Sequence, residues 1–318
     1  MPSLSVSFDQ YSDLVIDATV NFILTGPNRG SWSVGHCALG PIILQFGAEG
    51  GSKVLHGISR PDALTFILQD KQIADRMIFD GLIVQPEEFA VLPPASNFTI
   101  ASEGSNRWVS ATVPVALFGA HAAEIGRSDV ADIVREKRIV SPSQQSLDSF
   151  ISDAVSAAKF AREMPAPTLD GTGGGGRVVS ALLTALAGMI AAANRTVAVP
   201  TSSARLADDT VTRALEYVRG QKWGGLQVAN LALAADVTSR TLLRMFRQQL
   251  GMGPASYLKR RQLNIVRRAL RVGLGASAKI TDVMGEHGVT EFGRFASEYK
   301  ALFGERPSDT VARLRAAQ

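Results

Sequence analysis

Three arginines in the C-terminal part of the chain have the spacing of one helix face. Arg240, Arg244 and Arg247 are four and then three residues apart, so a helix would project them from one side. Guanidinium groups bind phosphate oxygens and the acceptor edge of guanine, which suits such a row to a nucleic-acid groove. An isolated arginine row is more often a solvated basic face, so the choice depends on the elements that carry it.

The segment 226–250 around these arginines predicts two short helices joined by a turn. Its apolar residues return at helical spacing on both sides of a break at 236–238; they are Leu231, Ala235, Val237, Leu242, Met245 and Phe246. Thr238 or Ser239 can cap the second helix by accepting hydrogen bonds from its free backbone amides. The segment has the pattern of a helix-turn-helix motif, with the arginines on the outer face of its second helix.

A second copy of this pattern follows. Residues 280–289 repeat the short first helix and its turn, and residues 290–303 repeat the second helix. The predicted buried row of that second helix is aromatic and consists of Phe292, Phe295, Tyr299 and Phe303. A connecting helix over 254–272 would be roughly 28 Å long, close to the roughly 34 Å between successive major-groove faces of DNA. Two copies at this separation favour DNA binding.

Residues 214–313 resemble the DNA-binding domain of the AraC/XylS family of bacterial transcription regulators. Three motifs carry the resemblance: residues 231–246 (LALAADVTSRTLLRMF), 251–261 (GMGPASYLKRR) and 295–308 (FASEYKALFGERPS). The resemblance implies an N-terminal cupin-like ligand-sensing barrel, a helical dimerisation element and promoter binding together with RNA polymerase. Val289 and Ser297 stand where the family usually has an aromatic residue and an arginine, and we expect Arg294 to take over the second contact.

The two motifs supply the residues that we expect to contact DNA. They are Thr238, Ser239, Arg240, Thr241, Arg244, Arg247, Glu291, Gly293, Arg294 and Ser297. The charge distribution agrees with this expectation. The formal net charge of +4 hides a basic segment 201–318, with 19 Lys and Arg against 10 Asp and Glu, and an acidic remainder with 14 against 19. A phosphate-binding domain needs such an excess of positive charge.

The first part of the chain, residues 8 to 120, has the pattern of a β domain. Short segments rich in β-branched and aromatic residues alternate with turn residues; they are 32–39, 42–46, 63–68, 77–84, 98–101 and 108–118. This pattern indicates a small sandwich or barrel, and the family resemblance favours the cupin-like barrel. The candidate ligand-binding residues are Trp32, His36, Phe46, His56, Arg60, Phe66 and Trp108. The alternative for each is a place in the core or at the rim.

Helical spacing begins at residue 143. Together with the apolar segment 178–193 it predicts a pair of helices, and the candidate dimerisation residues are Leu147, Phe150, Ile151, Ala154, Leu182 and Leu186. Packing against the barrel is the alternative role. The segment 178–193 is shorter than the roughly 20 residues that span a bilayer, which favours a buried helix. Residues 171–176 match GxGxxG formally, but no strand precedes them, so we expect a hinge.

Other chemistry has little support in the sequence. The four histidines are isolated, so we expect neither a metal nor a cofactor. Cys37 follows His36, but neighbouring residues of a strand point to opposite faces and could not form a catalytic pair. A single cysteine and an N-terminal segment without a basic stretch suit the cytoplasm rather than secretion or a membrane.

These observations predict an α+β protein. We expect a cupin-like ligand-sensing β domain over 1–140, a helical pair for dimerisation over 141–195, a linker over 196–206 and an AraC-type DNA-binding domain over 207–318. Within that last domain the helix-turn-helix motifs would span about 226–247 and 275–298. The predicted function is a non-enzymatic, ligand-responsive and sequence-specific regulator that binds operator DNA as a homodimer and activates a catabolic operon. The alternative is an enzyme whose catalytic barrel carries a DNA-binding tail.

Overall fold

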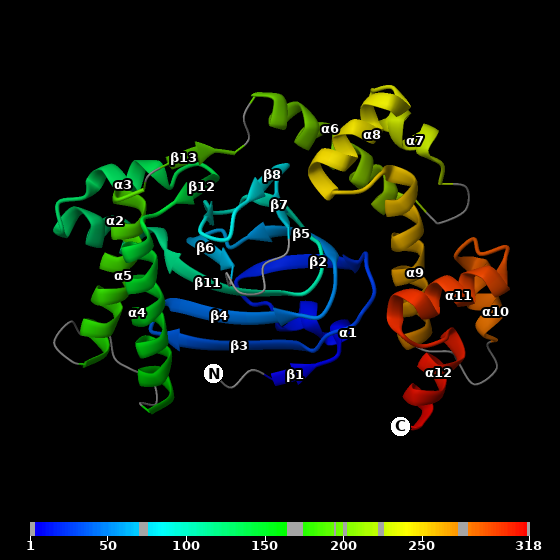
Figure 1. Ribbon diagram of the computed structural model, residues 1–318, viewed down its shortest axis with the longest axis horizontal. Coiled ribbons are helices and arrows are strands. Elements are labelled where there is room, and N and C mark those ends of the chain that lie inside the picture. Colours follow the sequence, from blue (N-terminus) through cyan, green and yellow to red (C-terminus); the bar gives the residue numbers. More distant parts are fainter. Residues whose placement is uncertain are drawn as a thin grey trace.

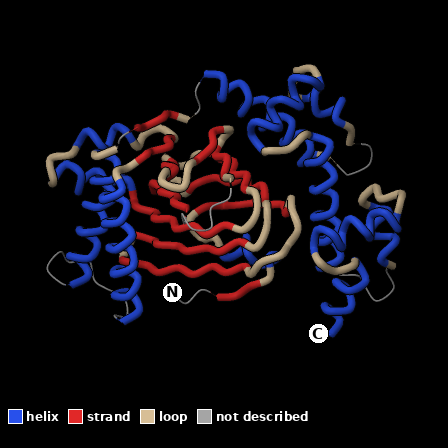
Figure 2. Tube along the Cα trace, viewed as in Figure 1, coloured by secondary structure: helices blue, strands red, loops and turns tan. Residues whose placement is uncertain are grey.

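The computed structural model describes residues 4–69, 76–163, 174–193, 195–199, 202–221, 226–272 and 279–316. Figure 1 shows a β-rich part in the middle, with the helices α2 to α5 at one end and the helices α6 to α12 at the other. The C-terminal part is entirely helical (Figure 2). The predicted α+β class is confirmed.

The β-rich part consists of two antiparallel sheets. The larger has the strand order β1 (Leu4–Val6), β3 (Trp32–Leu39), β4 (Ile42–Glu49), β11 (Asn106–Pro114), β6 (Ala63–Gln69), β9 (Phe89–Leu92), β12 (Arg138–Ser141) and β13 (Arg195–Ala198). The smaller has the order β2 (Ala18–Leu24), β5 (Lys53–Ser59), β10 (Asn97–Ser102), β7 (Met77–Phe79) and β8 (Leu82–Val84). The closed barrel that we expected is therefore wrong, because the strands described pair only within their own sheet.

The expected strand over 77–84 is a hairpin of β7 and β8. Asp80 and Gly81 form its turn with φ values of 44° and 83°. A two-residue turn with positive φ at both positions matches the twist of a hairpin, and Asp-Gly is among the pairs that adopt it most readily. The expected strand over 108–118 ends early for a different reason, because the helix α2 (Val115–Glu124) begins directly after Pro114.

A second layer of helices covers the outer face of the larger sheet. Besides α2 it contains α3 (Ser128–Ile133), α4 (Gln144–Glu163) and α5 (Gly174–Ala191), and α5 confirms the buried helix predicted over 178–193. None of the helices in the described ranges has the length and hydropathy of a bilayer-crossing segment. Of the hinge expected over 171–176, residues 171–173 lie outside the described residues, and residues 174–176 belong to the helix α5 instead.

The burial of α4 and α5 corrects our choice of dimerisation residues. Leu147, Phe150, Ala154, Leu182 and Leu186 are buried in the core that these helices share with the larger sheet. Only Ile151, of the residues chosen, is exposed, at 46%. The apolar spacing therefore reports packing against the β domain, which was the alternative role.

The C-terminal helices form two helix-turn-helix motifs, as predicted. α6 (Ser202–Gly220) precedes the first motif, α7 (Val228–Ala234) with α8 (Ser239–Leu250), and α10 (Ile280–Glu286) with α11 (Phe292–Phe303) forms the second. α9 (Pro254–Val272) joins the motifs and α12 (Pro307–Ala316) follows (Figure 1). The linker expected over 196–206 is wrong in part, because β13 pairs with β12 up to Ala198 and α6 begins at Ser202.

Candidate functional site

The first recognition helix, α8, is capped at both ends. Its N-cap is Thr238, whose hydroxyl accepts a hydrogen bond from the backbone amide of Thr241 at 3.1 Å. Its last turn ends at Gly251, which has a φ of 70° that favours glycine. Leu242 and Phe246 are buried on the inner face. These contacts fix the axial rotation of α8 and with it the face that points outward.

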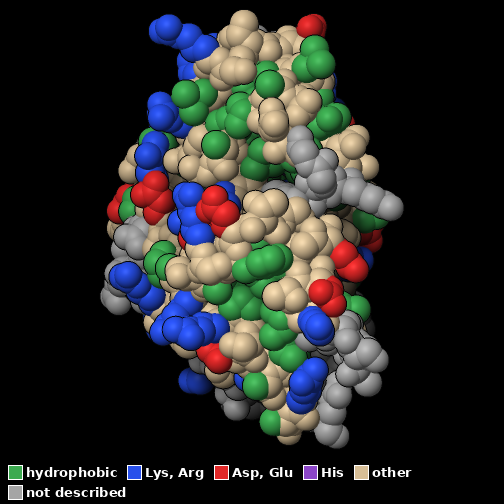
Figure 3. All heavy atoms as spheres, turned by 90° about the vertical axis from the view of Figure 1, so that its right-hand side faces the viewer, with side chains coloured by type: hydrophobic (Ala, Val, Ile, Leu, Met, Phe, Trp, Pro, Cys, Tyr) green, Lys and Arg blue, Asp and Glu red, His purple; other side chains and the backbone are tan. Residues whose placement is uncertain are grey.

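The outer face of α8 carries unpaired positive charge. Arg240, Arg244 and Arg247 are all exposed. None of the three forms a hydrogen bond or ion pair with the residues that the structure describes. Figure 3 shows Lys and Arg side chains along one border of this end of the molecule, with acidic side chains among them near the middle. Exposed guanidinium groups without protein partners are free to bind phosphates or base edges.

The charged side chains of the second recognition helix, α11, are paired with other residues of the chain. Arg294 donates to Glu298 over 3.1 Å and lies 3.5 Å from a carboxylate oxygen of Glu291. Lys259 of α9 also pairs with Glu298, at 2.7 Å. Ser297 donates to the backbone carbonyl of Gly293 over 3.1 Å. The expected contact residues of α11 are exposed, but their charges and polar groups already have partners within the chain.

Val289 occupies a buried position where the family usually has an aromatic residue. It is 7% exposed and lies in the core beneath the second motif, together with Met284 and Phe295. The position therefore serves packing, and an aliphatic residue can fill it.

Comparison with known proteins assigns the C-terminal domain. A family model described as a helix-turn-helix domain matches residues 231–313. The "XylDLEGF operon transcriptional activator 2" of Pseudomonas putida is 32% identical over 100 residues, which are 31% of this chain and 64% of that protein. An AraC-like transcription regulator of Streptomyces antibioticus is 32% identical over 106 residues, 33% of this chain and 34% of that protein. Residues 231–313 are therefore similar to the DNA-binding domains of AraC/XylS-type regulators.

The curated relatives reported above align to about a third of this chain. The chain spans less than two thirds of the length of the first curated relatives that it matches. Two solved structures align over more of the chain. They are the AraC-like transcriptional activator CuxR, with 13% identity over 90% of this chain and 100% of that chain at a TM-score of 0.42, and ToxT from Vibrio cholerae, with 10% identity over 93% and 98% at a TM-score of 0.32. The family assignment therefore depends on the C-terminal domain.

The β domain contains a cavity between its two sheets. Water-sized molecules can place their centres in about 50 Å³ of it. Apolar side chains of the smaller sheet, among them Val20, Leu55 and Met77, form one wall. Ile67 and Leu92 of the larger sheet add further apolar lining, and the polar lining consists of Tyr11, Asp17, Glu49, Lys53, Thr65, Asn106, Trp108 and Ser110. A mostly apolar cavity with a few convergent polar groups is the usual form of a small-molecule site.

Glu49 is the centre of a hydrogen-bond network in the polar lining. Its carboxylate accepts from the Tyr11 hydroxyl at 2.8 Å, from Trp108 Nε1 at 3.0 Å and from Asn106 Nδ2 at 3.4 Å. It also forms a buried ion pair with Lys53. Burial and the neighbouring charge of Glu49 raise the pKa of Tyr11 well above its usual value. With four donors in place, Glu49 has little capacity for a further partner.

Most of the predicted ligand-binding residues lie elsewhere. Only Trp108, of the residues chosen, lines the cavity. Phe46 and Phe66 point to the opposite face of the larger sheet, toward α4 and α5. His56 likewise lies on the outer face of the smaller sheet, where it meets Tyr257. Successive residues of a strand alternate between faces, so composition identified the strands but not the face that each residue occupies.

The other three predicted ligand-binding residues do not line the cavity either. Trp32 belongs to an aromatic cluster with Phe8 and Phe22 and does not line the cavity. His36 is exposed on β3. Arg60 lies beyond β5 and pairs with Asp62. The residues that sequence reasoning missed are Tyr11, Asp17, Glu49 and Lys53, which no local motif marks.

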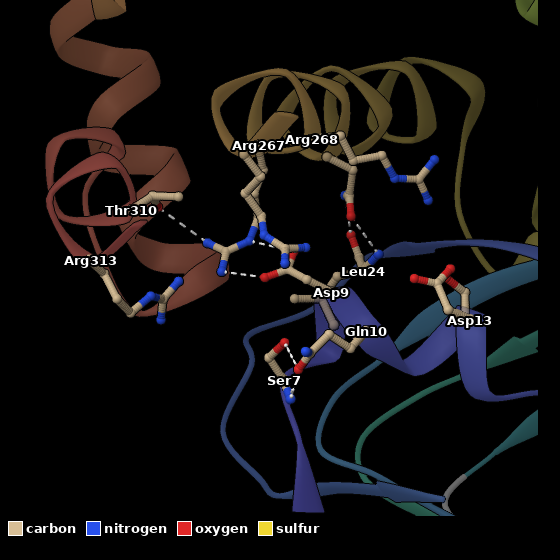
Figure 4. A network of polar contacts seen from close by, with 12 residues as sticks. Ser7, Asp9, Gln10, Asp13, Leu24, Arg267, Arg268, Thr310 and Arg313 are labelled. Carbon is tan, nitrogen blue, oxygen red and sulfur yellow. Dashed lines mark hydrogen bonds and ion pairs between the residues drawn. The ribbon is translucent and has the colours of Figure 1, made fainter. Parts of the chain in front are cut away.

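A polar interface joins the β domain to the connecting helix α9. Asp9, in the short helix α1 (Phe8–Tyr11), forms two hydrogen bonds of 2.9 Å with Arg267, and both side chains are 4% exposed (Figure 4). Asn264 exchanges hydrogen bonds of 3.0 Å with the backbone of Leu24. The ring of Phe8 stacks on that of Phe303 with centroids 5.5 Å apart. The two domains are therefore docked through buried and specific contacts.

Proposed function

We propose that this protein is a ligand-responsive, sequence-specific DNA-binding regulator that activates a catabolic operon. The observation that carries the proposal is the outer face of α8, where Arg240, Arg244 and Arg247 are exposed and make no hydrogen bond or ion pair within the described part of the chain. The operon activators among the relatives of this domain support activation as the outcome. Phosphate contacts would supply affinity and a few base contacts would supply sequence choice.

The cavity in the β domain supports the sensing part of the proposal. Tyr11 lines this cavity, and Asp9, two residues earlier in α1, binds Arg267 of the connecting helix. A ligand that displaces the Tyr11 hydroxyl from Glu49 would shift α1 and with it the partner of α9. The cavity and the recognition helices are thus linked through one turn of helix.

A homodimer and contact with RNA polymerase complete the proposal. If α4 contributes to a dimer, the contact would use Ile151 and Val155, which lie one turn apart and are each 46% exposed. The buried residues of α4 would stay in the core of each subunit.

Substitution of the α8 arginines tests the DNA-binding part. Arg240→Ala or Arg244→Ala should each weaken binding to a duplex selected from a random pool by about 1 to 3 kcal/mol and relax the base preference at one position. Gel-shift titration at a fixed salt concentration measures the loss. Arg294→Ala is the matched control, because its charge is already neutralised by Glu298 and Glu291, and it should cost clearly less.

Two outcomes would contradict the proposal. Unchanged affinity in both α8 variants would remove the assignment of α8 as the main recognition helix. Failure of the full chain to enrich any sequence from the pool would remove sequence-specific DNA binding itself.

A further inference from the structure

The cavity between the sheets contains a carboxylate that its own wall does not neutralise. Asp17 is 5% exposed, and its side chain accepts a hydrogen bond from the hydroxyl of Ser110. No lysine or arginine of the described ranges lies within ion-pair distance of it. Burial raises the pKa of Asp17, although the hydrogen bond from Ser110 opposes the change. Burying an ionised carboxylate without a cation costs free energy, so a positively charged group beside Asp17 would be stabilising.

A second group in the same cavity lacks a hydrogen-bond donor. Asn106 is 4% exposed, and its Nδ2 donates to Glu49. Its Oδ1 has no hydrogen-bond partner among the described residues. Asn106 and Ser110 are four residues apart on β11, so both project from the same face of the strand into the cavity. Buried amide oxygens normally accept a hydrogen bond, so a ligand that carries a donor could bind to Asn106 Oδ1.

The other charged groups of the wall need no ligand. Glu49 accepts from four side chains, and Lys53 is bound to Glu49 and donates to Ser102 Oγ over 3.2 Å. An anionic ligand would have to separate Lys53 from Glu49, and it would bring acceptors to a lining whose donors already bind Glu49 and Asp17. Asp17 and Asn106 can both accept a hydrogen bond from a ligand.

We propose that this cavity binds a small organic ammonium ion, with its nitrogen donating to the Asp17 carboxylate and its carbon chain against the apolar wall. The inference rests on the proposed ligand-sensing function and names the class of effector. Asp17 carries the charge, Ser110 orients its carboxylate, and Val20, Leu55 and Met77 contact the carbon chain. Where Asp17 is protonated in the empty cavity, its proton passes to solvent as the ammonium ion binds.

The size of the cavity limits the ligand. One water molecule needs about 10 to 15 Å³ of the volume open to its centre, so the 50 Å³ here holds about four non-hydrogen atoms. Propylammonium has this size. A longer chain would require the sheets to separate.

Three ligands of equal length test the chemistry on the full-length protein. Propylamine hydrochloride should raise the unfolding temperature and give a binding isotherm in calorimetry, whereas 1-propanol and sodium propionate should do neither. Calorimetry in buffers of different ionisation enthalpy should show that the number of protons released on amine binding increases as the pH is lowered. Asp17→Asn should weaken amine binding about tenfold or more, because a charge-assisted hydrogen bond is lost.

Asp62→Asn is the matched control. Asp62 is exposed and lies outside the cavity, so this variant should bind the amine as the parent protein does. The ligand series on the parent protein decides the class of ligand even if Asp17→Asn does not fold.

Several outcomes would overturn the inference. They are stronger binding of propionate or propanol than of the amine, undiminished amine binding by Asp17→Asn, and no amine binding up to about 10 mM, which is weaker than a specific site should be. Gel-shift titration of the same protein separates this inference from the proposed function. Sequence-specific DNA binding without amine binding removes only the ligand class, whereas amine binding without DNA binding removes the regulator and leaves the cavity assignment standing.

Discussion

Arg244 and Arg294 are the same residue type on equivalent helices, yet their charges are available to DNA to different degrees. Arg244 has no ion-pair partner within the described residues, whereas Arg294 is held by Glu298 and Glu291. Burial alone would raise the pKa of Glu298, but hydrogen bonds and charges from Lys259 and Arg294 lower it. Glu298 therefore stays ionised and competes with a phosphate for both cations.

Removal of the Glu298 charge should strengthen DNA binding. Glu298→Gln frees Lys259 and leaves Arg294 paired only with Glu291, so the slope of log affinity against log salt should become steeper by about one phosphate contact. Titrations at several salt concentrations measure the slope. Glu286→Gln is the control: it removes the same charge from exposed α10, where Glu286 pairs with no described residue. Equal slopes for the two variants would show a general charge effect and contradict the competition.

At the scale of single elements, α8 illustrates how local sequence fixes a functional surface. Its capping threonine, its apolar stripe and its terminal glycine are all recognisable without coordinates, because each acts on neighbours within four residues. The hairpin at Asp80 and Gly81 is equally local, and the turn signal could have divided the expected strand. The closure of the sheets had no such signal, because it depends on which distant edges pair.

Loss of the α8 cap should destabilise the start of the recognition helix. Thr238→Ala removes the acceptor for the Thr241 amide and should cost about 0.5 to 2 kcal/mol, whereas Thr238→Ser keeps the hydroxyl and should cost less. Hydrogen exchange of the first amides of α8 measures the local effect. Equal exchange in the two variants would assign the role of Thr238 to its methyl group.

At the scale of the whole molecule, the interface between the β domain and α9 decides how independent the two domains are. Arg267 binds Asp9 across the interface and Glu305 within the C-terminal domain. Its guanidinium also lies 4.9 Å from the ring centroid of Phe8 and 4.7 Å from that of Phe303. Figure 4 shows Asp9 pointing from α1 toward this arginine. One side chain therefore connects both domains.

Loss of the Asp9 charge should uncouple the domains. Asp9→Asn removes the charge that binds Arg267 across the interface, while Glu305 still pairs with Arg267, and should cost about 1.5 to 3 kcal/mol of docking stability. Urea unfolding followed by fluorescence and circular dichroism should change from one transition to two. Glu305→Gln is the control, because Glu305 contacts Arg267 only from within the C-terminal domain. A single transition at an unchanged midpoint in Asp9→Asn would contradict the coupling.

His56 should make the same interface sensitive to acid. Its ring meets Tyr257 at a centroid distance of 6.4 Å, and burial, helped by the charge of Arg219, lowers the pKa of His56 to about 3. The unfolded value is about 6.5, so undocked protein binds a proton that docked protein excludes, and stability rises with pH. The contribution is complete above about pH 6.5 and is lost as pH falls toward 3. Unfolding titrations should show a weaker pH dependence in His56→Gln; an identical dependence would rule out His56 as its source.

The sequence by itself determined the helix-turn-helix pair, the arginine face of α8 and the basic charge of the C-terminal domain. Each of these depends on spacing within one or two turns of helix or on composition. Only the tertiary structure decided which residues line the cavity, which arginines keep a free charge and how the domains meet. These features join residues as distant as Asp9 and Arg267, which are 258 positions apart. No local preference encodes such a pair, because its stability comes from burial that exists only once both domains have folded.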